Sequence, residues 1–354
     1  MPVRFGLIGA GVAGELNASA MRIVPDVHVV AIADVDLQRA KALAERYNIP
    51  EIYESTETLL ANASVDAVAI LTPHHLHLRD ARAAAKAGKH ILVEKAFAHT
   101  VSAADEMIDV CRAYGVTLGG IFQYRFTPAA RALRQTVLDG SLGRIFLASV
   151  SVKLRRAAEY YQRAPWRARK DEARGGVLMI QAIHTLDLLL WVMGMPRRVL
   201  GRTGTVVHPI EVEDLAVGFL EWGNGSIGVL QATTAAVPEN PPELEIHGDR
   251  GTAATFDSRG NLLFWSSTLD RPGSLPERWT MYASQFREQE AAAPSQATAE
   301  PHAENIRDFV AAVREGRRPL VDGAEARKAL LIVDALYRSA AQERWIELGP
   351  SDSC

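Results

Sequence analysis

A glycine-rich turn directly after a short apolar run constrains the fold of this chain more than any other feature. Residues 3–8 form the apolar run and predict a buried strand. Gly9, Gly11 and Gly14 follow it in the spacing G-x-G-x-x-G. In this spacing the glycines permit a tight turn, let a pyrophosphate approach the backbone and let the next helix pack closely on the sheet. Because a helix N-terminus also favours an anion, the stretch predicts a dinucleotide-binding unit.

An acidic residue at the end of the next apolar run indicates which dinucleotide binds. Residues 27–33 form this run, and Asp34 follows it 20 residues after Gly14. A carboxylate at that position accepts hydrogen bonds from the ribose hydroxyls of NAD. It repels the 2′-phosphate of NADP, and no arginine follows until Arg39. We therefore predict NAD as the cofactor, with NADP less favoured; the alternative is a turn that binds nothing, with Asp34 capping a helix.

Strands and helices are expected to alternate through the first third of the chain. The further strands are predicted at residues 65–71, 90–93 and 117–122, and the further helices at residues 36–47, 77–87 and 102–114. Such alternation predicts βαβ units, a parallel sheet and an α/β fold.

The pattern changes after Tyr124. A helix is expected at 127–138, and strands are expected at 145–154, 199–207, 215–222, 226–234, 243–247, 252–256 and 261–265. Turn sequences at 223–225 and 259–261 indicate antiparallel neighbours. Residues 287–301 predict a loop, and two helices, 303–315 and 324–342, follow it.

The helix expected at residues 177–193 is apolar on nearly all sides, so its polar residues stand out. Gln181, His184 and Asp187 are spaced three apart and share one side over two turns. One interpretation is that this stripe lines a cleft and that His184 transfers a proton, since the pKa of histidine lies near physiological pH. The other is a core histidine that hydrogen-bonds to Asp187.

Lys95 is the second candidate for chemistry. It follows the buried strand expected at residues 90–93, and ligands of open α/β sheets bind beyond the carboxyl ends of the strands. The alternative is a surface lysine of the ordinary kind.

Composition favours a soluble globular protein in a reducing compartment. The 354 residues carry a net charge of −3, which gives no electrostatic reason to expect nucleic acid or a membrane as partner. Two cysteines, Cys111 and Cys354, make neither a disulfide framework nor a metal-ligand cluster, so we expect no metal and a cytoplasmic protein without a signal peptide. The apolar run at residues 186–195 contains Asp187 and is too short to span a bilayer.

The chain resembles the glucose–fructose oxidoreductase/inositol dehydrogenase (Gfo/Idh/MocA) family along nearly its whole length. The stretches that carry the resemblance are GLIGAGVAG, AIADVD, TPHHLH, AGKHILVEKA, YRFTP, GGVLMIQAIHTLDLL, EDLAVGFLEWGNGSIG and LYRSA. The resemblance implies a Rossmann NAD-binding domain over residues 1–123 and an α/β domain with a large open, mostly antiparallel sheet over 124–301. It gives the second domain the substrate site and oligomerisation, and it implies that residues 302–354 fold back onto the first domain.

The resemblance also assigns site residues. Lys95 and His184 match the catalytic lysine and histidine of the family, with His184 taking the hydroxyl proton and Lys95 stabilising the alkoxide. The cofactor-binding residues are then Gly9, Gly11, Val12, Ala13, Gly14, Asp34, Thr72, His77, Glu94 and Lys95. The substrate-binding candidates are Tyr124, Trp166, Arg167, Gln181, His184 and Asp187, the last of which either orients His184 or binds a substrate hydroxyl.

Two departures from the family pattern bear on function. Ala96 replaces the proline after the lysine, and Ile180 replaces the acidic residue four before the histidine. Lys95 and His184 either suffice without that acid or the chemistry has changed. We therefore expect an NAD-dependent dehydrogenase acting on a secondary alcohol of a sugar, sugar derivative or cyclitol, as a homodimer or homotetramer. The alternative is a non-catalytic NAD(P)-binding regulator of the same fold.

A local excess of positive charge precedes the polar helix. The segment 153–174 holds eight basic residues, namely Lys153, Arg155, Arg156, Arg163, Arg167, Arg169, Lys170 and Arg174. Three acidic residues oppose them, namely Glu159, Asp171 and Glu172. Arginines here could bind a carboxylate or phosphate of the substrate, or could form a solvated surface.

Overall fold

The computed structural model describes residues 2–256, 261–267 and 299–349, and these residues form two compact units. The N-terminal unit comprises 1–123, 171–174 and 299–330, and the second unit comprises 124–170, 175–298 and 331–354. The second unit is thus interrupted twice by chain that belongs to the first.

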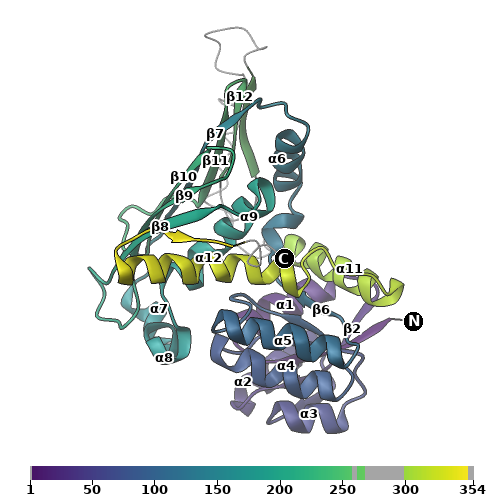
Figure 1. Cartoon of the computed structure of the whole chain (residues 1–354). Helices are drawn as coiled ribbons and strands as arrows, with labels where there is room; N and C mark the ends of the chain where they lie inside the picture. Colours follow the sequence, from purple (N-terminus) through teal and green to yellow (C-terminus); the bar gives the residue numbers. More distant parts are fainter. Residues whose placement is uncertain (1, 257–260, 268–298, 350–354) are drawn as a thin grey trace. The chain divides into compact units, whose positions relative to one another are not determined.

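The N-terminal unit contains a six-stranded parallel sheet (Figure 1). Its strands are β1 (Val3–Ile8), β2 (Val27–Ala33), β3 (Glu51–Tyr53), β4 (Ala67–Ile70), β5 (His90–Val93) and β6 (Leu118–Gly120). Their spatial order is β3-β2-β1-β4-β5-β6, and every neighbouring pair is parallel. This is the doubly wound order of dinucleotide-binding folds, which confirms the expected fold class.

Helices connect these strands. They are α1 (Val12–Arg22), α2 (Leu37–Tyr47), α3 (Thr56–Asn62), α4 (His77–Lys86) and α5 (Val101–Ala113). Asp36 caps α2 by accepting from the backbone N–H groups of Gln38 and Arg39. The sequence did not indicate β3 and α3, because a half-buried strand of three residues and a helix of seven give little periodicity.

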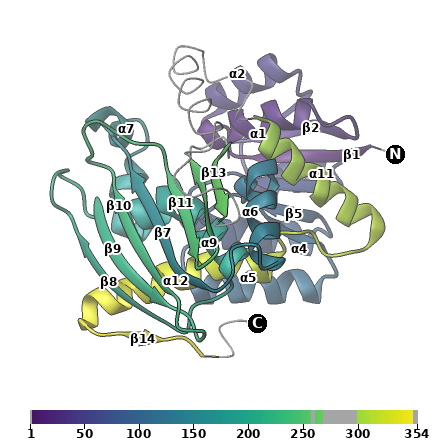
Figure 2. The same cartoon turned by 90° about the horizontal axis from the view of Figure 1, so that it is seen from above.

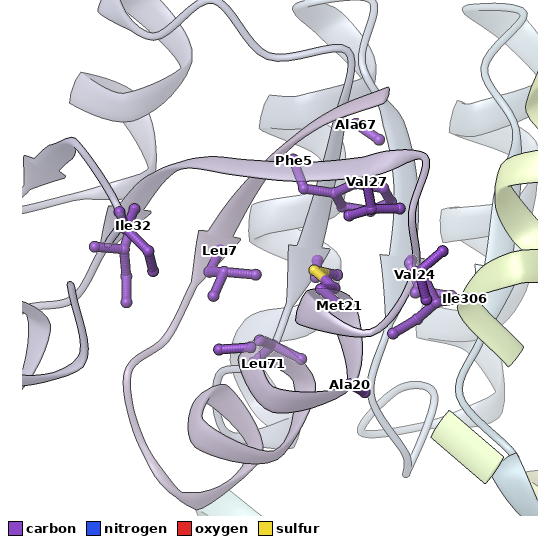
Figure 3. Packing of buried hydrophobic residues seen from close by; sticks show 14 of the residues in the cluster. Phe5, Leu7, Ala20, Met21, Val24, Val27, Ile32, Ala67, Leu71 and Ile306 are labelled. Atoms are coloured by element: carbon purple, nitrogen blue, oxygen red, sulfur yellow. The ribbon is translucent and has the colours of Figure 1, made fainter. Parts of the chain in front are cut away.

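The core on one side of this sheet combines residues from both ends of the chain (Figure 3). Phe5 and Leu7 from β1 and Met21 from α1 are buried together with Ile306. Ile306 lies on α11 (Ala299–Glu315), which packs on α1. Phe309 of the same helix lies 6.1 Å from Phe5 between ring centroids. The long-range packing of α11 therefore completes the core of the dinucleotide-binding fold.

The second unit is built on an eight-stranded sheet (Figure 2). Its strands are β7 (Ile145–Lys153), β8 (Arg198–Gly204), β9 (Leu215–Glu221), β10 (Ile227–Thr233), β11 (Glu243–Gly248), β12 (Gly251–Phe256), β13 (Asn261–Ser267) and β14 (Ile346–Glu347). The order is β13-β12-β11-β7-β10-β9-β8-β14, with β7 and β10 parallel and the other pairs antiparallel. The expected open, mostly antiparallel sheet is confirmed, and residues 223–225 turn the chain between β9 and β10.

The helices of this unit include α6 (Pro128–Leu138), α7 (Ala158–Gln162) and α9 (Ile183–Met193), and α9 packs on α6 and on strands β7 and β11. The segment before α9, Leu178–Ala182, is a π-helical turn. The predicted uniform helix at 177–193 is therefore wrong in its first turn, which is wider than an α-helix. The stretch Lys170–Met193 is long and apolar enough to cross a membrane, but 78% of its most apolar window is buried inside the protein, as in an ordinary core helix.

The C-terminal segment divides between the two units. Helix α12 (Gly323–Gln342) contributes its residues up to Leu330 to the N-terminal unit and the remainder to the second. β14 then pairs with β8 at the edge of the second sheet, with Ile346 opposite Val199. Residues 299–330 are thus grouped with the N-terminal unit and residues 331–354 with the second unit, and the expected folding back of 302–354 stays a prediction. The loop expected at 287–301 lies outside the described residues except for its last three, which begin α11.

Candidate active site

The glycine turn between β1 and α1 has the geometry that a dinucleotide needs. Gly9 has a φ of +111°, and a Cβ atom there would lie 2.8 Å from the carbonyl oxygen of Leu71. A Cβ atom on Gly14 would lie 2.5 Å from the carbonyl oxygen of Gly9. Gly11, in contrast, faces open space, with no heavy atom within 4 Å of a Cβ placed there. Two glycines are thus required by packing, and the third leaves room for a phosphate beside the α1 N-terminus formed by Val12 and Ala13.

Asp34 is held beside this turn by its own hydrogen bonds. One carboxylate oxygen accepts from the backbone N–H of Ala10 at 2.6 Å, and the other accepts from the N–H of Asp36 at 2.8 Å. Asp34 itself is half-buried at the end of β2. The residues present therefore fit NAD, because a negative charge is fixed where the adenosine ribose of a bound dinucleotide lies.

We expect Asp34→Ser to relax the preference for NAD over NADP. The Asp34 carboxylate and the 2′-phosphate of NADP repel by roughly 1 kcal/mol at about 4 Å in water. Removing this carboxylate should therefore lower the dissociation constant for NADPH, relative to that for NADH, by at least about fivefold. Fluorescence titration with NADH and NADPH measures this ratio. Asp36→Ser is the matched control, since it removes a charge two residues away and keeps a capping side chain on α2. Tighter binding of NADPH than of NADH by the unmodified protein would contradict the assignment.

Thr72 and His77 brace the chain at the carboxyl end of β4. The Nε2 atom of His77 lies 2.7 Å from the carbonyl oxygen of Thr72, and its Nδ1 atom lies 3.3 Å from that of Phe97. The Thr72 hydroxyl donates to buried Asp80 at 2.9 Å. His77 is fully buried, and this burial lowers its pKa. In the structure both residues form hydrogen bonds that hold the chain after β4 in place. Their expected contact with the cofactor stays a prediction.

Glu94 and Lys95 follow β5. The Glu94 carboxylate is buried and accepts from the backbone N–H of Lys95 at 2.8 Å and from Asn17 Nδ2 at 3.4 Å. Burial raises the pKa of Glu94. The buried Oδ1 atom of Asn17 has no hydrogen-bond partner among the described residues. Lys95 is half-buried, and its peptide bond to Ala96 is cis.

In the second unit, two of the predicted substrate residues come together. The rings of Tyr124 and His184 lie 5.0 Å apart between centroids with an angle of 31°. Both side chains are half-buried, so the imidazole is packed against an aromatic ring and remains partly accessible. Ile180, which replaces the acid of the family pattern, is buried.

Asp187 has a structural partner that the sequence analysis did not identify. Its two carboxylate oxygens accept from Nε and Nη2 of Arg125 at 2.8 and 2.7 Å. Both side chains are buried, with 0% and 1% of their surface exposed. Asp187 thus holds α9 to the segment before α6, and its proposed role toward His184 or substrate stays a prediction.

Gln181, Trp166 and Arg167 form a second group around Tyr160. Gln181 Nε2 donates to the Tyr160 hydroxyl at 3.0 Å. The Arg167 guanidinium lies over the rings of Tyr160, at 4.3 Å, and of Trp166, at 5.7 Å. Three of the predicted substrate residues are therefore neighbours, and Tyr160 is the residue that joins them.

A buried carboxylate anchors the start of the polar helix. Glu213 accepts from the backbone N–H groups of Gly176 at 2.7 Å and Leu178 at 2.9 Å. The Tyr337 hydroxyl also donates to it, at 2.8 Å. Burial raises the pKa of Glu213. This carboxylate satisfies N–H groups that the helix itself leaves open, and so it fixes where His184 lies.

We expect Glu213→Ala to lower the free energy of unfolding by about 1–3 kcal/mol, because two buried N–H groups lose their acceptor. Urea unfolding followed by circular dichroism measures the change. Glu211→Ala is the control: its carboxylate lies two residues away and accepts from the exposed backbone N–H of Lys170. An equal effect of both substitutions would show that the anchor contributes nothing specific.

Among residues 2–256, 261–267 and 299–349 we find no group of three histidine, cysteine or acidic side chains that could hold a metal ion. The sheet order and the glycine turn define the class as a dinucleotide-binding protein. Comparison with known proteins makes this specific. Residues 3–122 match the model of an oxidoreductase family with an NAD-binding Rossmann fold, and residues 130–254 match the GFO/IDH/MocA C-terminal domain. The chain belongs to the GFO/IDH/MocA family.

The relatives have both sugar and cyclitol substrates by name. Myo-inositol 2-dehydrogenase of Thermotoga maritima is 24% identical over 98% of both chains. Levoglucosan dehydrogenase of Pseudarthrobacter phenanthrenivorans is 28% identical over 97% of both chains. Among solved structures, the WlbA dehydrogenase of Bordetella pertussis in complex with NADH and UDP-GlcNAcA has a TM-score of 0.87, with 27% identity over 98% of both chains. The predicted family and the predicted NAD cofactor are confirmed.

Sequence reasoning missed four residues of these groups. Arg125, Glu213 and Tyr337 lie inside stretches that carry the family resemblance. Each is a charged or polar residue among apolar neighbours, and this contrast could have identified them. Tyr160 gave no signal, because it lies in a polar segment among exposed residues.

Proposed function

We propose that the protein is an NAD-dependent oxidoreductase that acts on a secondary alcohol or ketone of a sugar, sugar derivative or cyclitol. The observation that carries the proposal is the half-buried His184 packed on Tyr124 in a chain with an intact NAD-binding turn. The named relatives act on compounds of this class.

His184 is the proposed acid/base. When bound, NAD supplies the hydride acceptor for the carbinol carbon, and NADH supplies the donor in the reverse direction. His184 accepts the hydroxyl proton in oxidation and returns it in reduction, which needs an imidazole that can change protonation near neutral pH. Packing against Tyr124 supports this role, because it fixes the ring plane.

Lys95 has the complementary proposed role of stabilising negative charge on the alcohol oxygen. A cation held by the chain after β5 does this without rearrangement during the reaction. The buried, hydrogen-bonded Glu94 directly before it supports a fixed backbone there. No acid precedes His184 by four residues, so the proposal assigns proton transfer to His184 without one.

We assign cofactor binding and substrate binding to different units. Residues 1–123 bind the cofactor, and the second domain binds substrate and forms a homodimer or homotetramer. Assembly is supported by apolar side chains on the outer face of β9 and β10, where Leu215, Val217, Phe219 and Ile227 are 36–48% exposed. Sedimentation of the protein as a monomer at micromolar concentration would overturn this part.

The experiment that tests the activity is NADH absorbance with a panel of inositols, hexoses, uronates, sugar phosphates and nucleotide sugars, assayed in both directions. We expect turnover with at least one member. The alternative function, a cofactor-binding regulator, is favoured by Ile180; it predicts NADH binding with no turnover on the panel. Cys111 is buried and free, which is compatible with the cytoplasmic location that we propose.

A further inference from the structure

Among the described residues, Arg167 is a cation without a counter-ion. It lies in the 3₁₀ turn Pro165–Ala168 and is half-buried. In the described part of the chain, no carboxylate lies within ion-pair distance of it, and its buried Nε atom has no hydrogen-bond partner. A guanidinium does not lose its charge in a protein, so burial without an anion is costly.

The aromatic rings around Arg167 fix the guanidinium but do not neutralise it. Tyr160 lies at 4.3 Å on one side, and Trp166 lies at 5.7 Å. Such contacts hold the planar group in one orientation and leave its N–H edge to other partners. Tyr160 is fixed in turn by Gln181 and by the Arg156 guanidinium over its ring.

Gln181 brings this group next to the chemistry. Its Oε1 atom is also buried and has no hydrogen-bond partner among the described residues. Gln181 precedes His184 by three residues on the same helical segment, so the two side chains are neighbours along it. Arg167 and Gln181 thus both contact Tyr160, and each has a buried polar atom without a hydrogen-bond partner among the described residues. Gln181 precedes the proposed acid/base by three residues.

We infer that Arg167, Tyr160 and Gln181 form a subsite for an anionic substituent of the substrate, a carboxylate or phosphate on the sugar. The inference rests on the proposed function and specifies its substrate class. The Nε and Nη donors of Arg167 bind two oxygens of the anion side by side, as a planar fork does. The hydroxyl of Tyr160 and the amide of Gln181 bind an adjacent sugar hydroxyl. A neutral sugar leaves the guanidinium unpaired.

The test uses matched sugars that differ in charge at one carbon. D-glucose, D-glucuronate and D-glucose 6-phosphate form one set, and D-galactose, D-galacturonate and D-galactose 6-phosphate form a second. Both kcat/KM with NAD and binding, measured by isothermal titration in the presence of NADH, are determined for wild type, Arg167→Met and Arg163→Met. Methionine keeps an apolar stem against Tyr160, and melting temperatures establish that each variant folds.

We expect an anionic sugar to be preferred over its neutral counterpart by roughly 10- to 100-fold, the range for hydrogen bonds to a charged group. Arg167→Met should abolish that preference, because the anion loses the guanidinium that binds it. Arg163 is exposed and lies in the same segment, so Arg163→Met should leave the preference unchanged. The uronate and phosphate arms identify which anion fits. Much of the preference should remain at 0.5 M salt, because half-buried pairs are screened less than exposed ones.

Three results would overturn the inference: neutral sugars used or bound as well as anionic ones, a preference that survives Arg167→Met, or an equal loss in Arg163→Met, which would indicate diffuse attraction by the basic segment. Binding separates this outcome from failure of the proposed function. Anion binding that needs Arg167 but gives no turnover supports the subsite and contradicts the dehydrogenase. Equal turnover of neutral and anionic sugars, unchanged by Arg167→Met, supports the dehydrogenase and contradicts the subsite.

Discussion

Replacing His184 with alanine is expected to lower kcat by roughly 10²–10⁴-fold, the range that general acid–base catalysis contributes. The proton of the substrate hydroxyl then has no positioned acceptor. The fold should tolerate the change, because His184 is half-buried and its neighbour Tyr124 can move toward the space. NADH affinity should change little, since the cofactor turn lies in the N-terminal unit. Lys95→Ala should also lower turnover.

The measurement is steady-state turnover on the best member of the substrate panel, with NADH affinity determined on the same samples. His247→Ala is the control, because this imidazole lies on β11 and contacts Thr252 and Glu245. Normal turnover by the His184→Ala protein would eliminate the proposed mechanism. A loss of NADH binding parallel to the loss of turnover would show that the substitution acts through the fold instead.

Asp187→Ala is expected to lower the free energy of unfolding by about 3–5 kcal/mol, the cost of leaving one member of a buried ion pair without its partner. Arg125 would keep its charge with 1% of its side chain exposed. Trp191 reports on this place, since the Arg125 guanidinium lies 5.9 Å from its ring centroid. Urea unfolding followed by circular dichroism measures the effect, and a tryptophan signal that is lost in Trp191→Phe adds a local measurement.

The double variant Arg125→Met/Asp187→Leu distinguishes the contribution of the ion pair to the free energy of unfolding from that of side-chain packing. Apolar replacement of a whole buried ion pair is often neutral or stabilising, so the double variant should be more stable than Asp187→Ala. If the double variant is less stable than either single variant, the pair is not the cause. Turnover of Asp187→Ala, assayed below its unfolding transition, tests the separate prediction that Asp187 orients His184.

The fold was predictable because its signals are local. The run at 27–33 and the strand at 90–93 have the bounds expected from the sequence, and the glycine spacing predicted the turn between β1 and α1. Apolar periodicity and turn residues determine such elements with little help from distant chain. β14 could not be predicted in this way, since two residues become a strand only because β8 offers an edge.

The sequence suggests candidate site residues but not their contacts. Gln181, His184 and Arg167 are candidates by their positions, whereas their partners come from other parts of the chain. Arg125 and Asp187 are 62 residues apart, and Gln181 and Tyr160 are 21 apart. Neither pairing leaves a periodic signal. The π-helical turn was also hidden, because apolar periodicity does not distinguish it from an α-helix, and Glu213, which binds the N–H groups of Gly176 and Leu178, comes from a distant part of the chain.

The packing of α11 on α1 also has a consequence for how the chain folds during synthesis. The N-terminal unit receives Ile306 and Phe309 in its core, although its sheet is complete by Gly120. At about 5–20 residues per second, the ribosome needs roughly 10–40 s to reach these residues after the last strand. Throughout that interval the nascent sheet and α1 carry an uncovered apolar surface. Since chaperones bind such surfaces, we expect them to bind the emerging chain until Ile306 and Phe309 have been synthesised.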